Sequence, residues 1–153
     1  MKATDIMVGD ILWHRPSLMP VVVKSVHTWA EDPTDGWCYV QEIEPDAHYL
    51  DCTMCGFDMP PEEQKLKPFP ISREFLEANE DLFTGIIKND EGSYGGEFRT
   101  KIQGDVLFYY SPKKGLEVRT FCDDIYGCFR VNAVHELQHI LRMTGNETKF
   151  RFK

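Results

Sequence analysis

Short apolar segments separated by turn residues recur along this chain, and they limit the folds that it can adopt. Residues 11–14, 21–26 and 37–43 are such segments, and they are rich in β-branched and aromatic residues. Segments of this length and composition predict strands. The cluster Asp32-Pro33-Thr34-Asp35-Gly36 predicts a turn between the second and third. The N-terminal part is therefore expected to form a small, curled, SH3-like β-sheet.

The second half of the sequence mixes strands with helices. Ser72 is expected to cap a short central helix over residues 73–78, and residues 82–88, 97–102, 106–110 and 116–121 predict an antiparallel β-meander. Asn132 is expected to cap a C-terminal amphipathic helix that ends before Gly145. Residues 148–152 alternate polar and apolar side chains, which predicts a short edge strand. The predicted fold class is α+β.

A chain of 153 residues has the length of one domain, so we predict a single domain over residues 1–153. Residues 45–70 interrupt the strand pattern, because five of the nine prolines fall there with charged residues between them. This region is expected to be a long loop or an insertion. Loops of that length inside a domain are uncommon and are often functional.

Charge and composition narrow the classes of partner. The formal net charge is −8, which disfavours nucleic acid, because a phosphate backbone attracts basic surfaces. No apolar stretch is long enough to cross a membrane, and residues 1–10 carry two aspartates and no apolar run. The sequence therefore predicts a cytoplasmic protein whose five cysteines are thiols or metal ligands. The oligomeric state is left open.

The segment Val134-His135-Glu136-Leu137-Gln138-His139 contains the spacing H-E-x-x-H. In zinc hydrolases two histidines one helical turn apart bind the metal and the glutamate acts as general base. A catalytic zinc site also needs a third protein ligand, and the metzincin pattern has no match here, since Arg142 and Gly145 stand at its glycine and histidine positions. On a helical wheel, His135 and His139 lie opposite the aliphatic side. We interpret them as solvent-facing, metal-free residues and keep the hydrolase, with Glu136 as base, as an alternative.

The segment Cys52-Thr53-Met54-Cys55-Gly56 has the form of a zinc-knuckle turn. Cys122 and Cys128 are too far apart in sequence to supply a second knuckle, although His135 and His139 would complete a Cys₂His₂ set. The alternatives are therefore a zinc-stabilised interaction module and two loop thiols. Cys38, Cys122 and Cys128 are expected to be core residues.

Three segments together resemble a known group of sequences. They are residues 6–10 (IMVGD), residues 66–76 (LKPFPISREFL) and residues 134–139 (VHELQH) followed by Met143-Thr144-Gly145. The chain resembles short uncharacterised proteins of Bacteroides-type bacteria and of their phages or mobile elements. The resemblance covers most of the chain except residues 46–64, and it implies no activity and no functional residue. It also implies that H-E-x-x-H is a local variant, because the group commonly lacks the equivalents of Glu136 and His139.

The interpretation that the sequence favours is a small binding domain whose partner is another protein. Its acidic charge and its aromatic segments support this interpretation, although Trp13, Trp29, Trp37, Phe108, Tyr109 and Tyr110 are expected mainly in the core. No catalytic residue and no cofactor is favoured, with zinc as the alternative cofactor.

Overall fold

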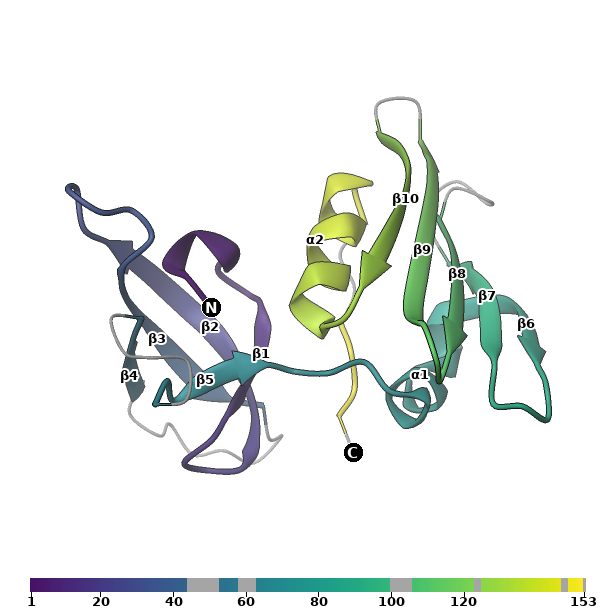
Figure 1. The fold of residues 1–153 in the computed structure, drawn as a ribbon, viewed down its shortest axis with the longest axis horizontal. Coiled ribbons are helices and arrows are strands. Elements are labelled where there is room, and N and C mark those ends of the chain that lie inside the picture. The colour runs from purple at the N-terminus through teal and green to yellow at the C-terminus, as the bar shows by residue number, and fades with distance from the viewer. Residues whose placement is uncertain (44–52, 58–62, 100–105, 123–124, 147–148, 153) are drawn as a thin grey trace. The chain divides into compact units, whose positions relative to one another are not determined.

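The computed structural model describes residues 1–43, 53–57, 63–99, 106–122, 125–146 and 149–152 (Figure 1). The chain divides into two compact units, Met1–Phe69 and Pro70–Lys153. Each unit contains a five-stranded sheet in which all neighbouring strands are antiparallel. The α+β fold and the curled N-terminal sheet expected from the sequence are thus confirmed. The interpretation of the chain as one domain stays a prediction.

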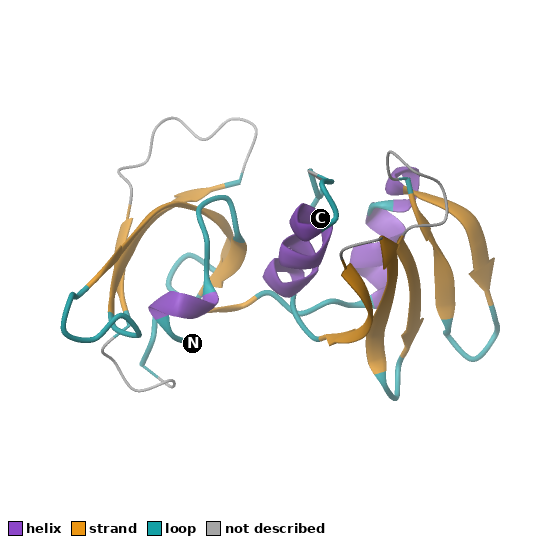
Figure 2. Ribbon diagram, turned by 90° about the horizontal axis from the view of Figure 1, so that it is seen from above, coloured by secondary structure: helices purple, strands orange, loops and turns teal. Residues whose placement is uncertain are grey.

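The N-terminal unit is a curled half-barrel (Figure 2), and its strand order is β4-β3-β2-β1-β5 (Figure 1). Its elements are a 3₁₀-helix, Ala3–Asp5, and the strands β1 Ile11–His14, β2 Met19–Thr28, β3 Gly36–Glu42, β4 Thr53–Gly56 and β5 Leu66–Pro68. The concave side holds the core: Ala3, Ile6, Leu12, Val21, Val23, Cys38, Val40, Cys55, Phe57 and Leu66.

An irregularity in β2 changes which side chains face outward. The register with β3 shifts between Val23 and Ser25, as in a β-bulge. A bulge bends a strand and re-aims the side chains that follow it. Val23 is buried opposite Val40, whereas His27 lies opposite Trp37 and is exposed.

The C-terminal unit has the strand order β10-β9-β8-β7-β6. Its elements are α1 Arg73–Ala78, a 3₁₀-helix Glu80–Leu82, β6 Phe83–Lys88, β7 Tyr94–Phe98, β8 Val106–Ser111, β9 Gly115–Cys122, β10 Ile125–Val131 and α2 Val134–Met143. One face of the sheet is buried and carries an aromatic cluster: Phe83, Tyr94, Phe98 and Phe108. We call the opposite face, which presents Ile87, Leu107, Tyr109, Glu117, Arg119 and Phe121, the open face.

Several predicted elements need correction. The described parts of residues 45–70 include β4 and β5, so this region is not wholly a loop. Strand β7, Tyr94–Phe98, begins three residues before the strand predicted over residues 97–102, because the glycines at 95 and 96 obscure the alternation. Strand β10 was not predicted, and helix α2 has its N-cap at Ala133 instead of Asn132.

The predicted C-terminal edge strand is also corrected. Residues 149–152, the part of this segment that the structure describes, are not in a strand. Backbone groups of Arg151 bond to the Asn79 side chain, and the Phe150 and Phe152 rings lie 5.2 and 5.8 Å from the Phe75 ring. The apolar residues of the tail thus pack on α1, which explains their alternation without a strand partner.

Candidate functional site

The glutamate of H-E-x-x-H has a structural role in helix α2. The backbone N–H groups of Asn132 and Ala133 donate to Oε2 of Glu136, with N···O distances of 2.8 and 3.3 Å. A glutamate at the third position of a helix satisfies backbone donors at the start of the helix in this way. Its negative charge also lies near the positive end of the helix dipole. Glu136 therefore caps the helix that carries it.

The two histidines of the motif do not both face solvent. His135 is only 5% exposed, and Gln138 beside it is also buried. The prediction that both histidines are solvent-exposed is therefore wrong for His135. Burial on α2 extends beyond the aliphatic stripe, which a helical wheel cannot anticipate. The His135 and His139 rings are neighbours with centroids 5.9 Å apart. Among the described residues, no three His, Cys, Asp or Glu side chains form a group that could hold a metal.

Cys55, the second cysteine of the C-x-x-C segment, lies in strand β4. Cys55 is buried in β4 opposite Cys38 of β3, and both are free thiols. Burial raises the pKa of both thiols, that of Cys38 to about 12, which disfavours the thiolate that zinc binds. Cys52 lies outside the described residues. Cys38 is confirmed as a core residue, whereas Cys128 is exposed on β10, so its predicted place in the core is wrong.

A group of four rings lies on the outer side of the N-terminal hairpin β2–β3. The His27 and Trp37 rings stack with centroids 5.2 Å apart and an interplanar angle of 14°. Trp29 packs on Trp37 at 4.7 Å, and Tyr39 presents its edge to His27 at 6.2 Å. Trp29 is 49% exposed and Tyr39 is 37% exposed, which corrects the expectation that Trp29 belongs to the core. We call His27, Trp29, Trp37 and Tyr39 the hairpin aromatic cluster.

Trp37 and Tyr39 fall in the segment 37–43 that the sequence predicts as a strand, but the sequence did not predict the cluster. Trp37 and Tyr39 alternate with buried Cys38 and Val40, which places them on one face of a strand. His27 gave no signal, because a regular strand from Val21 would turn it inward. The bulge after Val23 reverses that orientation and brings His27 onto Trp37.

Acidic charge is concentrated in the unit that carries this cluster. Residues 1–69 contain twelve Asp or Glu and five Lys or Arg, a net charge of −7, whereas residues 70–153 contain thirteen and twelve, a net charge of −1. The turn that closes the hairpin carries Glu31, Asp32 and Asp35. Asp32 accepts hydrogen bonds from the N–H and hydroxyl of Thr34, and these bonds lower the pKa of its carboxyl group. The aromatic rings thus lie next to a turn that holds an ionised carboxylate.

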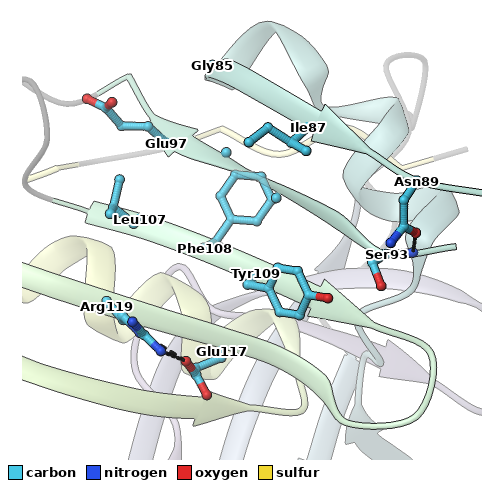
Figure 3. Close-up of a pocket in the computed structure, with 12 residues that line it drawn as sticks. Gly85, Ile87, Asn89, Ser93, Glu97, Leu107, Phe108, Tyr109, Glu117 and Arg119 are labelled. Atoms are coloured by element: carbon cyan, nitrogen blue, oxygen red, sulfur yellow. Dashed lines mark hydrogen bonds and ion pairs between the residues drawn. The ribbon is translucent and has the colours of Figure 1, made fainter. Parts of the chain in front are cut away.

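A second surface feature is a hollow of about 520 Å³ in the open face of the C-terminal sheet (Figure 3). Ile87, Gly95 and Tyr109 lie side by side across three strands, and the absent side chain of Gly95 leaves the space between the other two. Glu117 and Arg119 line the same hollow and form an ion pair with a distance of 2.7 Å. The volume is within the range of small-molecule pockets, roughly 300–1,000 Å³.

Comparison with known proteins returned no family: no family model matches the chain, and no curated protein and no solved structure matches it. Among the described residues, none of the helices has the length and apolar character that a membrane crossing requires. The hairpin aromatic cluster and the hollow in the open face are therefore the two candidate functional surfaces.

Proposed function

We propose that the N-terminal unit is a protein-binding domain whose hairpin aromatic cluster receives a cationic segment of a partner protein. The observation that carries this proposal is a cluster of four packed rings, with His27, Trp29 and Tyr39 exposed around a half-buried Trp37, in a unit with a net charge of −7. Tryptophan and tyrosine are the residues most often found at the energetic centres of protein interfaces.

The geometry of the cluster supports binding because the rings restrain one another. Trp37 has His27 stacked on it and Trp29 packed at 4.7 Å. Side chains that are already ordered lose little conformational entropy when a partner arrives, so more of the contact energy is available for affinity. The cluster is thus suited to bind without rearrangement.

Charge supports a cationic occupant over other classes. The faces of tryptophan and tyrosine rings carry negative electrostatic potential and attract arginine and lysine, by about 0.5–2 kcal/mol per contact. The carboxylates of Glu31, Asp32 and Asp35 add to that attraction, and Lys24 is the only Lys or Arg in residues 19–42. Single-stranded nucleic acid also stacks on aromatic rings, but its phosphates require a basic groove, which an acidic unit opposes.

Tryptophan fluorescence tests this proposal directly. In a Trp13→Phe background, the full chain keeps Trp29 and Trp37 as reporters, and it would be titrated with hexa-arginine, hexa-glutamate and a neutral Gly-Ser peptide. We expect saturable binding of hexa-arginine alone, and at least tenfold weaker binding after Trp29→Ala. Tyr109→Ala is the matched control, because Tyr109 is an equally exposed aromatic residue in the other unit, at 51%.

Two results would count against the proposal. If hexa-arginine binds Trp29→Ala as tightly as the parent, net charge alone attracts the peptide and the cluster has no role. If the neutral or acidic peptide binds equally well, the cationic specificity is wrong. The zinc hydrolase and the zinc-stabilised module remain alternative predictions. The cytoplasmic location also stays a prediction.

A further inference from the structure

We propose that a second copy of this chain docks on the open face of the C-terminal sheet, with Ile87 of each copy in the Gly95 hollow of the other. The residues that carry this inference all lie in residues 70–153, so it does not depend on the function proposed for the N-terminal unit. Its basis is the shape of one row of side chains and the apolar and charged residues around it.

The row combines a protrusion and a depression. Ile87 lies opposite Gly95, and Gly95 lies opposite Tyr109, so the three residues cross β6, β7 and β8 in register. Ile87 is 73% exposed, and the hollow that it lines is also lined by Gly95 and Gly96. When two identical faces meet across a two-fold axis, the protrusion of each copy can enter the hollow of the other.

The two adjacent glycines have different explanations. A Cβ at Gly96 would lie 3.1 Å from the Thr84 carbonyl oxygen and 3.2 Å from the Phe108 ring, so core packing accounts for that glycine. A Cβ at Gly95 would lie 3.3 Å from the Phe108 carbonyl oxygen and 3.5 Å from the Tyr109 ring, on the open face. The Phe108 backbone would have to move by a few tenths of an ångström to accommodate it. A glycine inside a strand weakens the strand and often marks a close approach by another molecule.

The open face has the apolar surface that an interface needs. Ile87, Tyr109 and Phe121 are 73%, 51% and 44% exposed, and Leu107 lies in the next row of the same face, opposite Glu97 and Arg119. Exposed apolar residues are ordinary when scattered singly, but several on one sheet face indicate an interaction surface. Burial of these side chains would be the driving force for docking.

Charge favours a second copy as the occupant. The C-terminal unit has a net charge of −1, so two copies of this unit repel each other little, unlike two copies of the N-terminal unit at −7. The open face also carries both signs, with Glu117 next to Arg119 and Arg130, and with Glu97 two strands away from Arg119 across Leu107. A two-fold arrangement can place acids of one copy against bases of the other, which a strongly acidic or strongly basic partner would not match.

Sedimentation velocity of the full chain over a 100-fold range of concentration tests the inference. We expect a monomer–dimer equilibrium in the parent, and at least a tenfold higher dissociation constant in Ile87→Asp, which removes the protrusion, and in Gly95→Val, which fills the hollow. Val8→Asp is the matched control, because Val8 is an exposed aliphatic residue in the other unit and the charge change is identical. Ile87→Ala and Gly95→Ala are milder variants that serve if circular dichroism shows unfolding.

A parent chain that is monomeric throughout the range would overturn the inference, and the open face would then belong to a different occupant. A dimer that both variants leave unchanged would also overturn it, because association would then use another surface. An equal loss in Val8→Asp would show that added negative charge alone opposes association, with the same consequence.

Discussion

The Asn79 side chain holds the backbone of Arg151 by two hydrogen bonds. The Arg151 N–H donates to Oδ1 of Asn79 at 2.7 Å, and Nδ2 of Asn79 donates to the Arg151 carbonyl oxygen at 3.0 Å. The same Nδ2 group also donates to the Phe75 carbonyl oxygen at 2.8 Å. One fully buried amide thus joins the end of α1 to a segment 72 residues further along the chain.

We expect Asn79→Ala to lower the free energy of unfolding by about 2–4 kcal/mol, because it leaves the buried Phe75 carbonyl and the part-buried backbone groups of Arg151 without their partner. Urea denaturation measures this change. Arg151→Ala is the control, since it removes the exposed ion pair with Asp81 and keeps the backbone bonds, and should cost less than about 1 kcal/mol. Equal costs for the two variants would contradict the role assigned to Asn79.

Glu136 is expected to contribute to stability through the helix cap. Glu136→Ala should lower the free energy of unfolding by about 0.5–1 kcal/mol, because the N–H groups of Asn132 and Ala133 lose their acceptor. Glu136→Gln keeps an acceptor oxygen and should cost less, and thermal denaturation of the two variants measures the difference. If neither variant changes stability but both abolish a zinc-dependent hydrolysis, the catalytic interpretation of H-E-x-x-H is correct instead.

Gly36 is required by the hairpin that carries the aromatic cluster. Its φ is +145°, and a Cβ there would lie 2.0 Å from the His27 carbonyl oxygen, so Gly36→Ala should cost more than about 3 kcal/mol. Gly85→Ala is the control, because φ is +59° and nothing lies within 4 Å of the added atom, so only the left-handed conformation costs about 1–2 kcal/mol. Chemical denaturation of both variants measures the difference. A Gly36→Ala chain as stable as Gly85→Ala would show that the hairpin turn is formed differently.

The thiols should differ in reactivity and in their effect on stability. Cys128 is exposed and should react with iodoacetamide much faster than buried Cys38 and Cys55, which peptide mass spectrometry resolves. Burial raises the pKa of Cys38 from 9.0 to about 12, so folding favours the neutral thiol. The resulting contribution to the free energy of unfolding is fully present below pH 9. It is lost as pH rises from about 9 to 12, because in that range the thiol ionises in the unfolded chain but not in the folded one.

A comparison of the parent with Cys38→Val isolates this effect. We expect the parent to lose more stability than the variant between pH 8 and pH 11 in urea denaturation, because the variant has no thiol to ionise at that position. Parallel curves would mean that the Cys38 thiol has an ordinary pKa and is not desolvated in the core.

The local elements near turn and cap residues were predictable because their determinants lie within a few residues. Ser72 accepts a hydrogen bond from the Phe75 N–H and starts α1 at Arg73, as expected, and Gly145 ends the last helix with φ of +75°. Strand β1 has the predicted bounds. The strand that contains Gly95 and Gly96 was obscured because glycine contributes neither β-propensity nor an alternating pattern.

Short-range patterns were sufficient to predict the α+β class, the curled first sheet, the meander and the amphipathic last helix, because strand alternation, caps and turns depend on neighbouring residues. The positions of the side chains depended on long-range contacts. The bulge in β2 exposes His27, and the β7–β8 register places Gly95 at the hollow. Asn79 binds the backbone of the C-terminal tail, whose alternating pattern predicts a strand. Each of these outcomes depends on a partner distant in sequence or on a one-residue shift of register, and local sequence patterns predict neither the partner nor the shift.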